Sequence, residues 1–204
     1  MLQGAPGQSS IMDRWKLLND MIRLHTPLER EALRGLKAGD WVSITGTLFT
    51  ARDQTHRRMV ELLEEGRQLP VDLKGAIIYY VGPTPAPPGL PCGAAGPTTS
   101  YRMDAYTPKI LELGVLALMG KGRRSNEVRD SLKKFGAIYL ATLGGAGAYL
   151  AQRVKKCELI AFKDLGPEAL YRFEVVDFPA VVINDLNGND YYERILSGLN
   201  RGIV

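Results

Sequence analysis

The sequence predicts an α/β domain built on a central mixed sheet. Segments with apolar residues at helical spacing alternate along the chain with short runs that are typical of strands. No internal repeat is visible, which argues against a solenoid or a propeller. The chain has 204 residues, 45% of them apolar, which is enough for one compact domain with its own core.

An amphipathic helix is predicted ahead of the domain. Residues 11–25 place isoleucine, tryptophan, leucine and methionine at helical spacing. We therefore divide the chain into an N-terminal extension over residues 1–35 and a catalytic-type domain over residues 36–204. The helix either docks on a partner or packs back on its own domain, and the pattern leaves both open.

The first half of the domain predicts a strand, a helix and a second strand. Residues 36–53 alternate between polar and apolar, which indicates a strand pair or one long strand kinked at Gly46. Residues 55–66 have helical spacing, with Thr55 as the expected N-cap. Residues 75–83 form a continuous apolar run between glycine and proline, the pattern of a buried strand.

The second half continues the alternation. Residues 107–120 predict a helix that leads into a short strand, and residues 126–136 predict a helix that ends at its terminal glycine. Residues 137–164 indicate a β–α–β unit, whose strands we expect to be parallel with a right-handed crossover. Strands of mixed character and an Asn-Gly turn follow over residues 170–192, and residues 192–201 predict a helix.

Charge and hydropathy disfavour nucleic acid and membrane as partners. The net charge is +4, but the basic residues are scattered and do not interleave with aromatic residues along one strand. Either a mildly cationic surface or a local anion-binding cleft explains the positive net charge. No run approaches the roughly 18–20 apolar residues of a membrane span, and no secretory signal is visible. The cytoplasm is the expected location.

The metal-ligating residues are few. The chain has two cysteines, Cys92 and Cys157, and two histidines, His25 and His56. An iron–sulfur cluster generally needs three or four thiolates, so this chain is not expected to hold one alone. A self-contained zinc site is also not expected. Both cysteines are interpreted as ordinary small side chains without chemistry.

The first of three candidate sites is the glycine stretch GGAGAYLA. Gly145 and Gly147 follow a predicted strand, and Asp164 ends the next one, as in a dinucleotide-binding fold. Leu150 stands where that fold would need its third glycine. The alternative is a tight strand-to-helix turn whose backbone amides face some other anion.

The second candidate site is TARDQTHRRM. Arg52 and Asp53 stand where a strand gives way to a helix, an open end where side chains converge on ligands. His56 is either a general acid or base or, more often for a single helix histidine, a packed one. Arg57 and Arg58 are expected to be solvated.

The third candidate site is the loop GPTTSYRMD. Arg102 offers a planar fork of donors for a carboxylate, and Thr98 and Thr99 add hydroxyls. Lys121, between two glycines in GKGRR, can approach the same pocket. Together with Arg52, these residues suit a small dianion such as a dicarboxylate. The alternative is that they are unrelated loop residues.

Three motifs then carry a resemblance. In order, GDWVSITGTLFTARDQTHRRM, YYVGPTPAPPGLPCGAAGPTTSYRMD and ALMGKG resemble the β subunit of two-subunit, iron–sulfur-dependent class I fumarate hydratases. The same module forms the C-terminal domain of the single-chain versions and the β subunit of L-tartrate dehydratase. The resemblance runs from about residue 36 to the NGND turn near residue 190 and leaves out the N-terminal helix.

The resemblance implies a swivelling β/β/α domain that closes over a [4Fe–4S] cluster. In that family the α subunit supplies the three cluster cysteines, and the open fourth iron activates the hydroxyl of malate. The implied activity is the reversible hydration of fumarate to (S)-malate, a reaction of the tricarboxylic acid cycle. It needs the α subunit, in a heterotetramer of two α and two β chains.

The resemblance also implies residue roles. Arg52 and Arg102 grip the substrate carboxylates, Lys121 adds a third cation, and Thr99 lies with them in the substrate site. Thr98 is the family's proposed base, although an alcohol is hard to deprotonate. The alternative is that Thr98 orients the substrate while an α-subunit carboxylate moves the proton.

The choice of substrate class stays open at this point. TARDQTH and YRMD are closer to the fumarase form than to the tartrate dehydratase form, which tends to carry a cysteine near RD and the sequence MRME. The alternatives are an L-tartrate dehydratase β subunit, a nucleotide-binding module built on GGAGAYLA, and a non-catalytic scaffold subunit.

Overall fold

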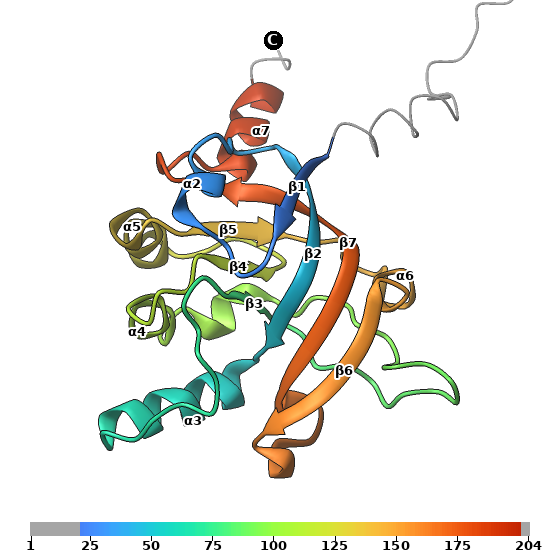
Figure 1. Ribbon diagram of the computed structural model, residues 1–204. Coiled ribbons are helices and arrows are strands. Elements are labelled where there is room, and N and C mark those ends of the chain that lie inside the picture. The colour runs from blue at the N-terminus through green and yellow to red at the C-terminus, as the bar shows by residue number, and fades with distance from the viewer. Residues whose placement is uncertain (1–20, 201–204) are drawn as a thin grey trace, which may run out of the picture.

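The computed structural model describes residues 21–200, which form a mixed α/β domain around one sheet (Figure 1). Within that range the sheet has seven strands in the order β1-β2-β3-β4-β5-β7-β6. They are β1 (Ile22–His25), β2 (Trp41–Thr50), β3 (Ile77–Tyr79), β4 (Ala117–Gly120), β5 (Ile138–Ala141), β6 (Val154–Ala161) and β7 (Leu170–Asn184). The predicted α/β class with a central mixed sheet is confirmed.

The sheet closes into a barrel. Strands β1 to β5 pair parallel in sequence order, whereas β7 pairs antiparallel with β5, with β6 and also with β2. The β2–β7 pairing closes the ring of β2, β3, β4, β5 and β7, with β1 and β6 attached outside it. Strand β7 has 15 residues, which is long enough for several partners. Its N-terminal part pairs with β6, and its C-terminal part pairs with β5.

The helices surround the barrel. Within the described residues they are α2 (Arg30–Leu33), α3 (Asp53–Glu64), η1 (Ser100–Met103), α4 (Thr107–Leu111), α5 (Asn126–Phe135), α6 (Gly147–Ala151), η2 (Lys163–Glu168) and α7 (Tyr191–Asn200). The helices α3, α4 and α5 lie together on one outer face of the sheet (Figure 1). None of the described helices is long and apolar enough to span a membrane.

Strand β3 shows how one apolar run serves two cores. Alternate side chains of a strand point to opposite faces. Ile77 and Tyr79 pack inside the barrel, and Ile78 and Tyr80 pack outside it against α3, α4 and α5. All four are at most 1% exposed, which explains why this run is apolar without alternation.

The N-terminal helix prediction is wrong at its C-terminal end. Residues 22–25 form β1, which pairs parallel with β2 and buries Leu24 against the barrel core. Local spacing favoured a helix, but pairing with a long strand competes with it, and Pro27 disfavours helical backbone at the residue before it. Residues 11–20 of the predicted helix lie outside the described residues, and the division at residue 35 stays a prediction.

Strand β2 is one long strand with a kink, the second form that the sequence left open. Its register with β7 shifts between Ile44 and Gly46, and Gly46 has a φ of 117°. A Cβ atom on Gly46 would collide with the hydroxyl of Thr26. The bend therefore requires glycine for two reasons, its backbone conformation and its close neighbour.

Replacing Gly46 by alanine is expected to lower the free energy of unfolding by about 2 kcal/mol, because strain and collision add. Urea unfolding of the two proteins at neutral pH measures the difference. Gly35→Ala is the matched control, since Gly35 has no heavy atom within 4 Å of the added Cβ. Equal midpoints for wild type and Gly46→Ala would contradict the strain argument.

Four further expectations concern helix ends and strand pairing. The helix α5 ends at Gly136, which has a φ of 66°, and the C-terminal helix is present as α7. Thr55 is not an N-cap: α3 begins at Asp53, and the Thr55 hydroxyl donates to the Glu168 carbonyl. The predicted β–α–β unit is correct in strand direction, because β5 and β6 are each antiparallel to β7 and so run parallel to one another, but β7 lies between them and they are not hydrogen-bonded neighbours.

Candidate functional site

The candidate site lies at one edge of the barrel, where four parallel strands end. The strands β2, β3, β4 and β5 pair parallel with their neighbours, so their carboxyl ends meet at the same edge. Arg52 follows β2, the loop with Thr98 follows β3, Lys121 follows β4, and the glycines from Gly144 follow β5. In α/β sheets this edge is the usual place for a ligand.

Thr98 and Lys121 are held side by side by their backbones. The Thr98 amide donates to the Tyr80 carbonyl at 2.7 Å, just beyond β3, and the Thr98 carbonyl accepts from the Lys121 amide at 3.3 Å. The Ser100 amide returns to the Lys121 carbonyl at 2.9 Å, and Thr99 forms a parallel bridge with Lys121. The two threonines and the lysine of the third sequence site are therefore neighbours, as predicted from the loop.

Arg52 is fixed from two sides at the start of α3. Its guanidinium binds Glu168 of η2 at 3.0 Å, and both side chains are about one-fifth exposed. It passes so close to Gly82 that a Cβ atom there would lie 3.2 Å from Nη1. The backbone carbonyl of Arg52 accepts a hydrogen bond from His56 Nδ1 at 2.8 Å. These contacts hold the guanidinium at the carboxyl edge.

Arg102 reaches the same helix start from η1. Its Nη2 donates to Asp53 at 2.8 Å, and Asp53 follows Arg52 directly in the chain. The Arg102 side chain is 40% exposed while that of Asp53 is 19% exposed, so the cation faces outward. A guanidinium has five N–H donors, and one bond to Asp53 leaves others for a second acceptor.

His56 is a packed, neutral residue. It is fully buried, and desolvation lowers its pKa to about 4, against the hydrogen bond to the Arg52 carbonyl, which acts to raise it. Its ring meets the ring of Tyr80 edge-on at 5.4 Å. At neutral pH the imidazole is uncharged, and its Nδ1–H supports the backbone of Arg52. Of the two interpretations of His56, this arrangement favours packing over acid–base chemistry.

The other two arginines of this segment pair at the surface, as the sequence indicates. Arg57 binds Glu61 at 2.8 Å along α3, and Arg58 binds Asp164 of η2 at 2.9 Å. The hydrogen bond from Arg58 lowers the pKa of Asp164. Asp164 thus faces Arg58, which leaves it unsuited to the ribose carboxylate role of a dinucleotide fold.

The glycine stretch belongs to this same edge. A Cβ atom on Gly147 would lie 3.1 Å from the Gly96 amide nitrogen, and the Gly147 carbonyl accepts from Ala95 at 3.0 Å. Gly144 lies beside the aliphatic stem of Lys121. The helix that follows, α6, has five residues. These glycines permit close approach to the threonine loop, which corresponds to the tight-turn alternative.

Some partners of the site have little or no signal in the sequence. Glu168 lies far along the chain from Arg52, and no local pattern connects the two. Asp53 was visible next to Arg52, but its pairing with Arg102 depends on the fold. Glu168 lies in η2, and nothing in its own segment indicates that it meets Arg52.

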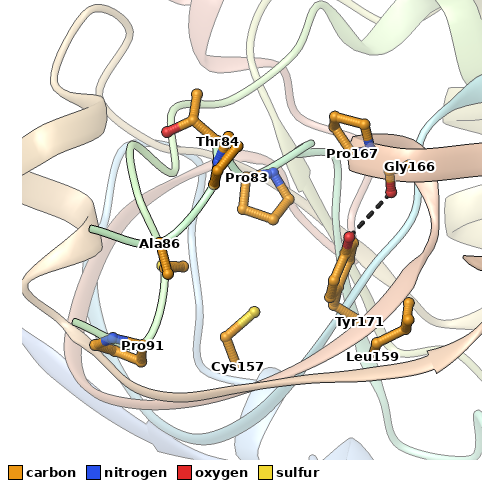
Figure 2. A pocket seen from close by; sticks show the side chains of 11 residues that line it. Pro83, Thr84, Ala86, Pro91, Cys157, Leu159, Gly166, Pro167 and Tyr171 are labelled. Atoms are coloured by element: carbon orange, nitrogen blue, oxygen red, sulfur yellow. Dashed lines mark hydrogen bonds between the residues drawn. The ribbon is translucent and has the colours of Figure 1, made fainter. Parts of the chain in front are cut away.

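A cavity of about 470 Å³ lies apart from these residues, and no proposed substrate contact lines it (Figure 2). The proline-rich loop lies on one side, and Cys157, Leu159 and Tyr171 of the β6–β7 pair lie on the other. Burial raises the pKa of Cys157 to about 11 and also raises that of Cys92, so both thiols are protonated at neutral pH. Among residues 21–200, no group of three or more His, Cys, Asp or Glu side chains could hold a metal ion.

Comparison with known proteins places this chain in one family. The family model described as Fumarase C-terminus matches residues 5–195. The chain is 44% identical to fumarate hydratase 1, mitochondrial, of Leishmania major, over 156 residues that cover 76% of this chain and 28% of that protein. It is 41% identical to the anaerobic class I fumarate hydratase of Escherichia coli over 158 residues, 76% of this chain and 29% of the relative.

A shorter relative has a different name. The putative L(+)-tartrate dehydratase subunit beta of Methanocaldococcus jannaschii is 37% identical over 174 residues, which cover 82% of this chain and 89% of that protein. The chain thus spans less than a third of the fumarate hydratases above and most of the tartrate dehydratase subunit. By the extent of the model match and by these identities, the chain belongs to the Fumarase C-terminus family.

Proposed function

We propose that this chain is the β subunit of a two-subunit hydro-lyase that interconverts fumarate and (S)-malate. The observation that carries the proposal is that Arg52 and Lys121 follow parallel strands at one edge of the barrel, where Arg102 pairs with Asp53 next to Arg52 and the Thr98 backbone pairs with that of Lys121. The relatives named as fumarate hydratases support the reaction class. The short relative named as a subunit beta supports the division into two chains.

The three cations match a four-carbon dicarboxylate. A guanidinium binds a carboxylate through two parallel N–H groups, and two guanidiniums from different loops can grip the two ends of one substrate. Glu168 and Asp53 hold these arginines in place before substrate arrives. Pre-oriented cations lose little freedom on binding, so more of the binding energy is available to the reaction.

The proton transfer concerns the carbon next to a carboxylate. Removal of that proton leaves negative charge that spreads onto the carboxylate, where Arg102 and Lys121 stabilise it as it develops. Thr98 lies next to Lys121 and is either the base or the group that orients the substrate for a carboxylate of the partner. The role of base would require a cation close to the hydroxyl, because an alcohol is otherwise hard to deprotonate.

The cluster belongs to the partner in this proposal. Two cysteines, one buried beside the core, do not make the donor set of a [4Fe–4S] cluster. A cluster held by an α-type subunit would act as a Lewis acid on the leaving hydroxyl. The heterotetramer, the swivelling closure and the cytoplasmic location are parts of the same proposal.

L-Tartrate dehydration is the second candidate function. The observation that favours it is the likeness to the putative L(+)-tartrate dehydratase subunit beta, which is 37% identical over 82% of this chain. Tartrate and malate share both carboxylates and a hydroxyl, so the three cations would serve either substrate. The sequences TARDQTH and YRMD are closer to the fumarase form, which supports fumarate as the first candidate substrate.

The deciding experiment is anaerobic co-expression with a class I fumarase α subunit from the same source. We expect fumarate hydration that requires both chains. A cluster-loaded complex that ignores fumarate and dehydrates L-tartrate would replace the first function by the second. Failure of the chains to associate would reject both.

A further inference from the structure

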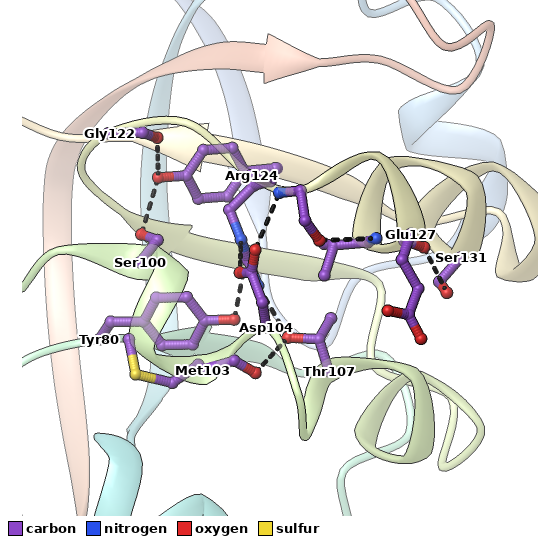
Figure 3. Close-up of polar contacts among 12 residues, drawn as sticks. Tyr80, Ser100, Met103, Asp104, Thr107, Gly122, Arg124, Glu127 and Ser131 are labelled. Carbon is purple, nitrogen blue, oxygen red and sulfur yellow. Dashed lines mark hydrogen bonds and ion pairs between the residues drawn. The ribbon is translucent and has the colours of Figure 1, made fainter.

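A buried arginine lies directly behind the candidate site. Arg124 follows Lys121 by three residues, yet its side chain has no exposed surface, whereas Lys121 is exposed. Its Nε donates to Asp104 at 2.8 Å, its Nη1 to the Tyr80 hydroxyl at 3.1 Å and its Nη2 to Thr107 at 2.7 Å (Figure 3). The guanidinium therefore binds three separate side chains.

The ion pair between Arg124 and Asp104 connects the segments that carry the site residues. Asp104 ends the loop with Thr98 and Arg102, and its second oxygen accepts from the Ser125 amide at 2.8 Å. Arg124 and Ser125 belong to the loop that begins at Lys121. One carboxylate thus joins the substrate loop after β3 to the lysine loop after β4.

Two aromatic rings complete the connection. The Arg124 guanidinium lies 5.3 Å from the ring centre of Tyr80 and 5.1 Å from that of Tyr139. The Tyr139 hydroxyl donates to the Gly122 carbonyl at 2.9 Å and bonds Ser100 Oγ at 2.8 Å. Ser100 Oγ also accepts from the Lys121 amide at 3.1 Å. Ser100 and Gly122, which the Tyr139 hydroxyl joins, directly follow Thr99 and Lys121 in the chain.

A contribution to stability does not by itself explain why the buried Arg124–Asp104 ion pair is present. The cost of removing water from a buried ion pair offsets much of its attraction, and apolar residues of similar size often replace such pairs without loss. Arg124 has the geometric advantage of a rigid fork that fixes the direction of each bond. Fixed directions matter where two loops must present cations to one small substrate.

We propose that Arg124 and Asp104 are positioning residues that set the placement of Lys121 relative to Thr98 and Arg102. Neither touches the substrate. The effect of these residues on catalysis rests on the proposed function. The coupling of the two loops does not depend on which substrate is used.

The test is the double variant Arg124→Met/Asp104→Asn, in the full chain and in the complex with an α-type subunit. It removes both charges together and leaves no unpaired ion, so the melting temperature is expected to stay near that of wild type. We expect kcat/KM to fall on the order of 100-fold through kcat, since a small displacement of a catalytic group costs about this much. Arg124→Lys, which keeps the charge without the fork, is expected to stay impaired as well.

A second measurement separates this proposal from the proposed function. Amide hydrogen exchange of the chain alone is expected to speed up in residues 98–104 and 120–125 of the double variant and nowhere else. The matched control, Arg129→Met/Glu193→Gln, removes the bidentate pair between α5 and α7 and is expected to leave both loops and the activity unchanged.

The outcomes are distinct. Unchanged exchange in the two loops, or a wild-type kcat in the double variant, would overturn the positioning role and leave an ordinary structural ion pair. A wild-type complex without activity on either dicarboxylate would reject the proposed function, and faster exchange in the variant would still support the coupling of the loops.

Discussion

Arg102→Ala is expected to lower kcat/KM for fumarate hydration by about 1,000-fold in the reconstituted two-subunit enzyme, equivalent to about 4 kcal/mol of transition-state stabilisation. Arg102 contributes a charge-assisted, bidentate contact to a carboxylate whose charge grows during proton removal. Its loss also frees Asp53, a carboxylate that would then repel the substrate. Steady-state rates under anaerobic conditions measure the effect.

Lysine at the same position is expected to recover little of this loss. The ammonium group is a point charge and cannot bind Asp53 and a substrate carboxylate in the fixed geometry of the guanidinium. We therefore expect Arg102→Lys to remain about 100-fold below wild type, by the same measurement.

Arg58→Ala is the matched control for these variants. Arg58 also pairs with an aspartate, Asp164, at 2.9 Å, but it does so at the surface away from the strand ends. We expect unchanged kinetics for it. An assembled, cluster-loaded Arg102→Ala complex with near wild-type activity would favour the scaffold alternative and remove this residue from the site.

His56 is expected to make the folded chain sensitive to mild acid. Its pKa is lowered to about 4 in the folded protein by desolvation, from the ordinary histidine value of 6.5. Between these values the unfolded chain binds a proton that the folded chain does not, so stability is complete above pH 6.5 and falls as the pH decreases. The free energy of unfolding should drop by about 2 kcal/mol between pH 7 and pH 5, and by about 3 kcal/mol near pH 4.

Urea unfolding at both pH values, compared between wild type and His56→Gln, isolates this contribution from that of the carboxylates. The variant is expected to be less stable at pH 7 but to lose less stability on going to pH 5. His25→Gln is the control at the only other histidine in the chain. Identical pH dependence for wild type and His56→Gln would show that the imidazole does not stay neutral in the folded state.

The sequence by itself determined the elements whose pattern is local. The apolar run of β3, the kink of β2 at Gly46, and the end of α5 at Gly136 follow from neighbouring residues. The same holds for Lys121, because it lies just beyond the apolar run of β4, whereas Thr98 follows a long loop and reaches the same edge through its hydrogen bond to the Tyr80 carbonyl. Local spacing is sufficient where the determinant is backbone conformation or the face of a single element.

Only the tertiary structure decided which strands are neighbours and which charges meet. Residues 22–25 form a strand because β2 offers them a partner, and β7 separates β5 from β6 because its length closes the barrel. Glu168 meets Arg52, and Arg124 turns inward to Asp104, across long stretches of sequence. Such contacts depend on burial and pairing between distant segments, and the periodicity of one segment carries no information about its partner.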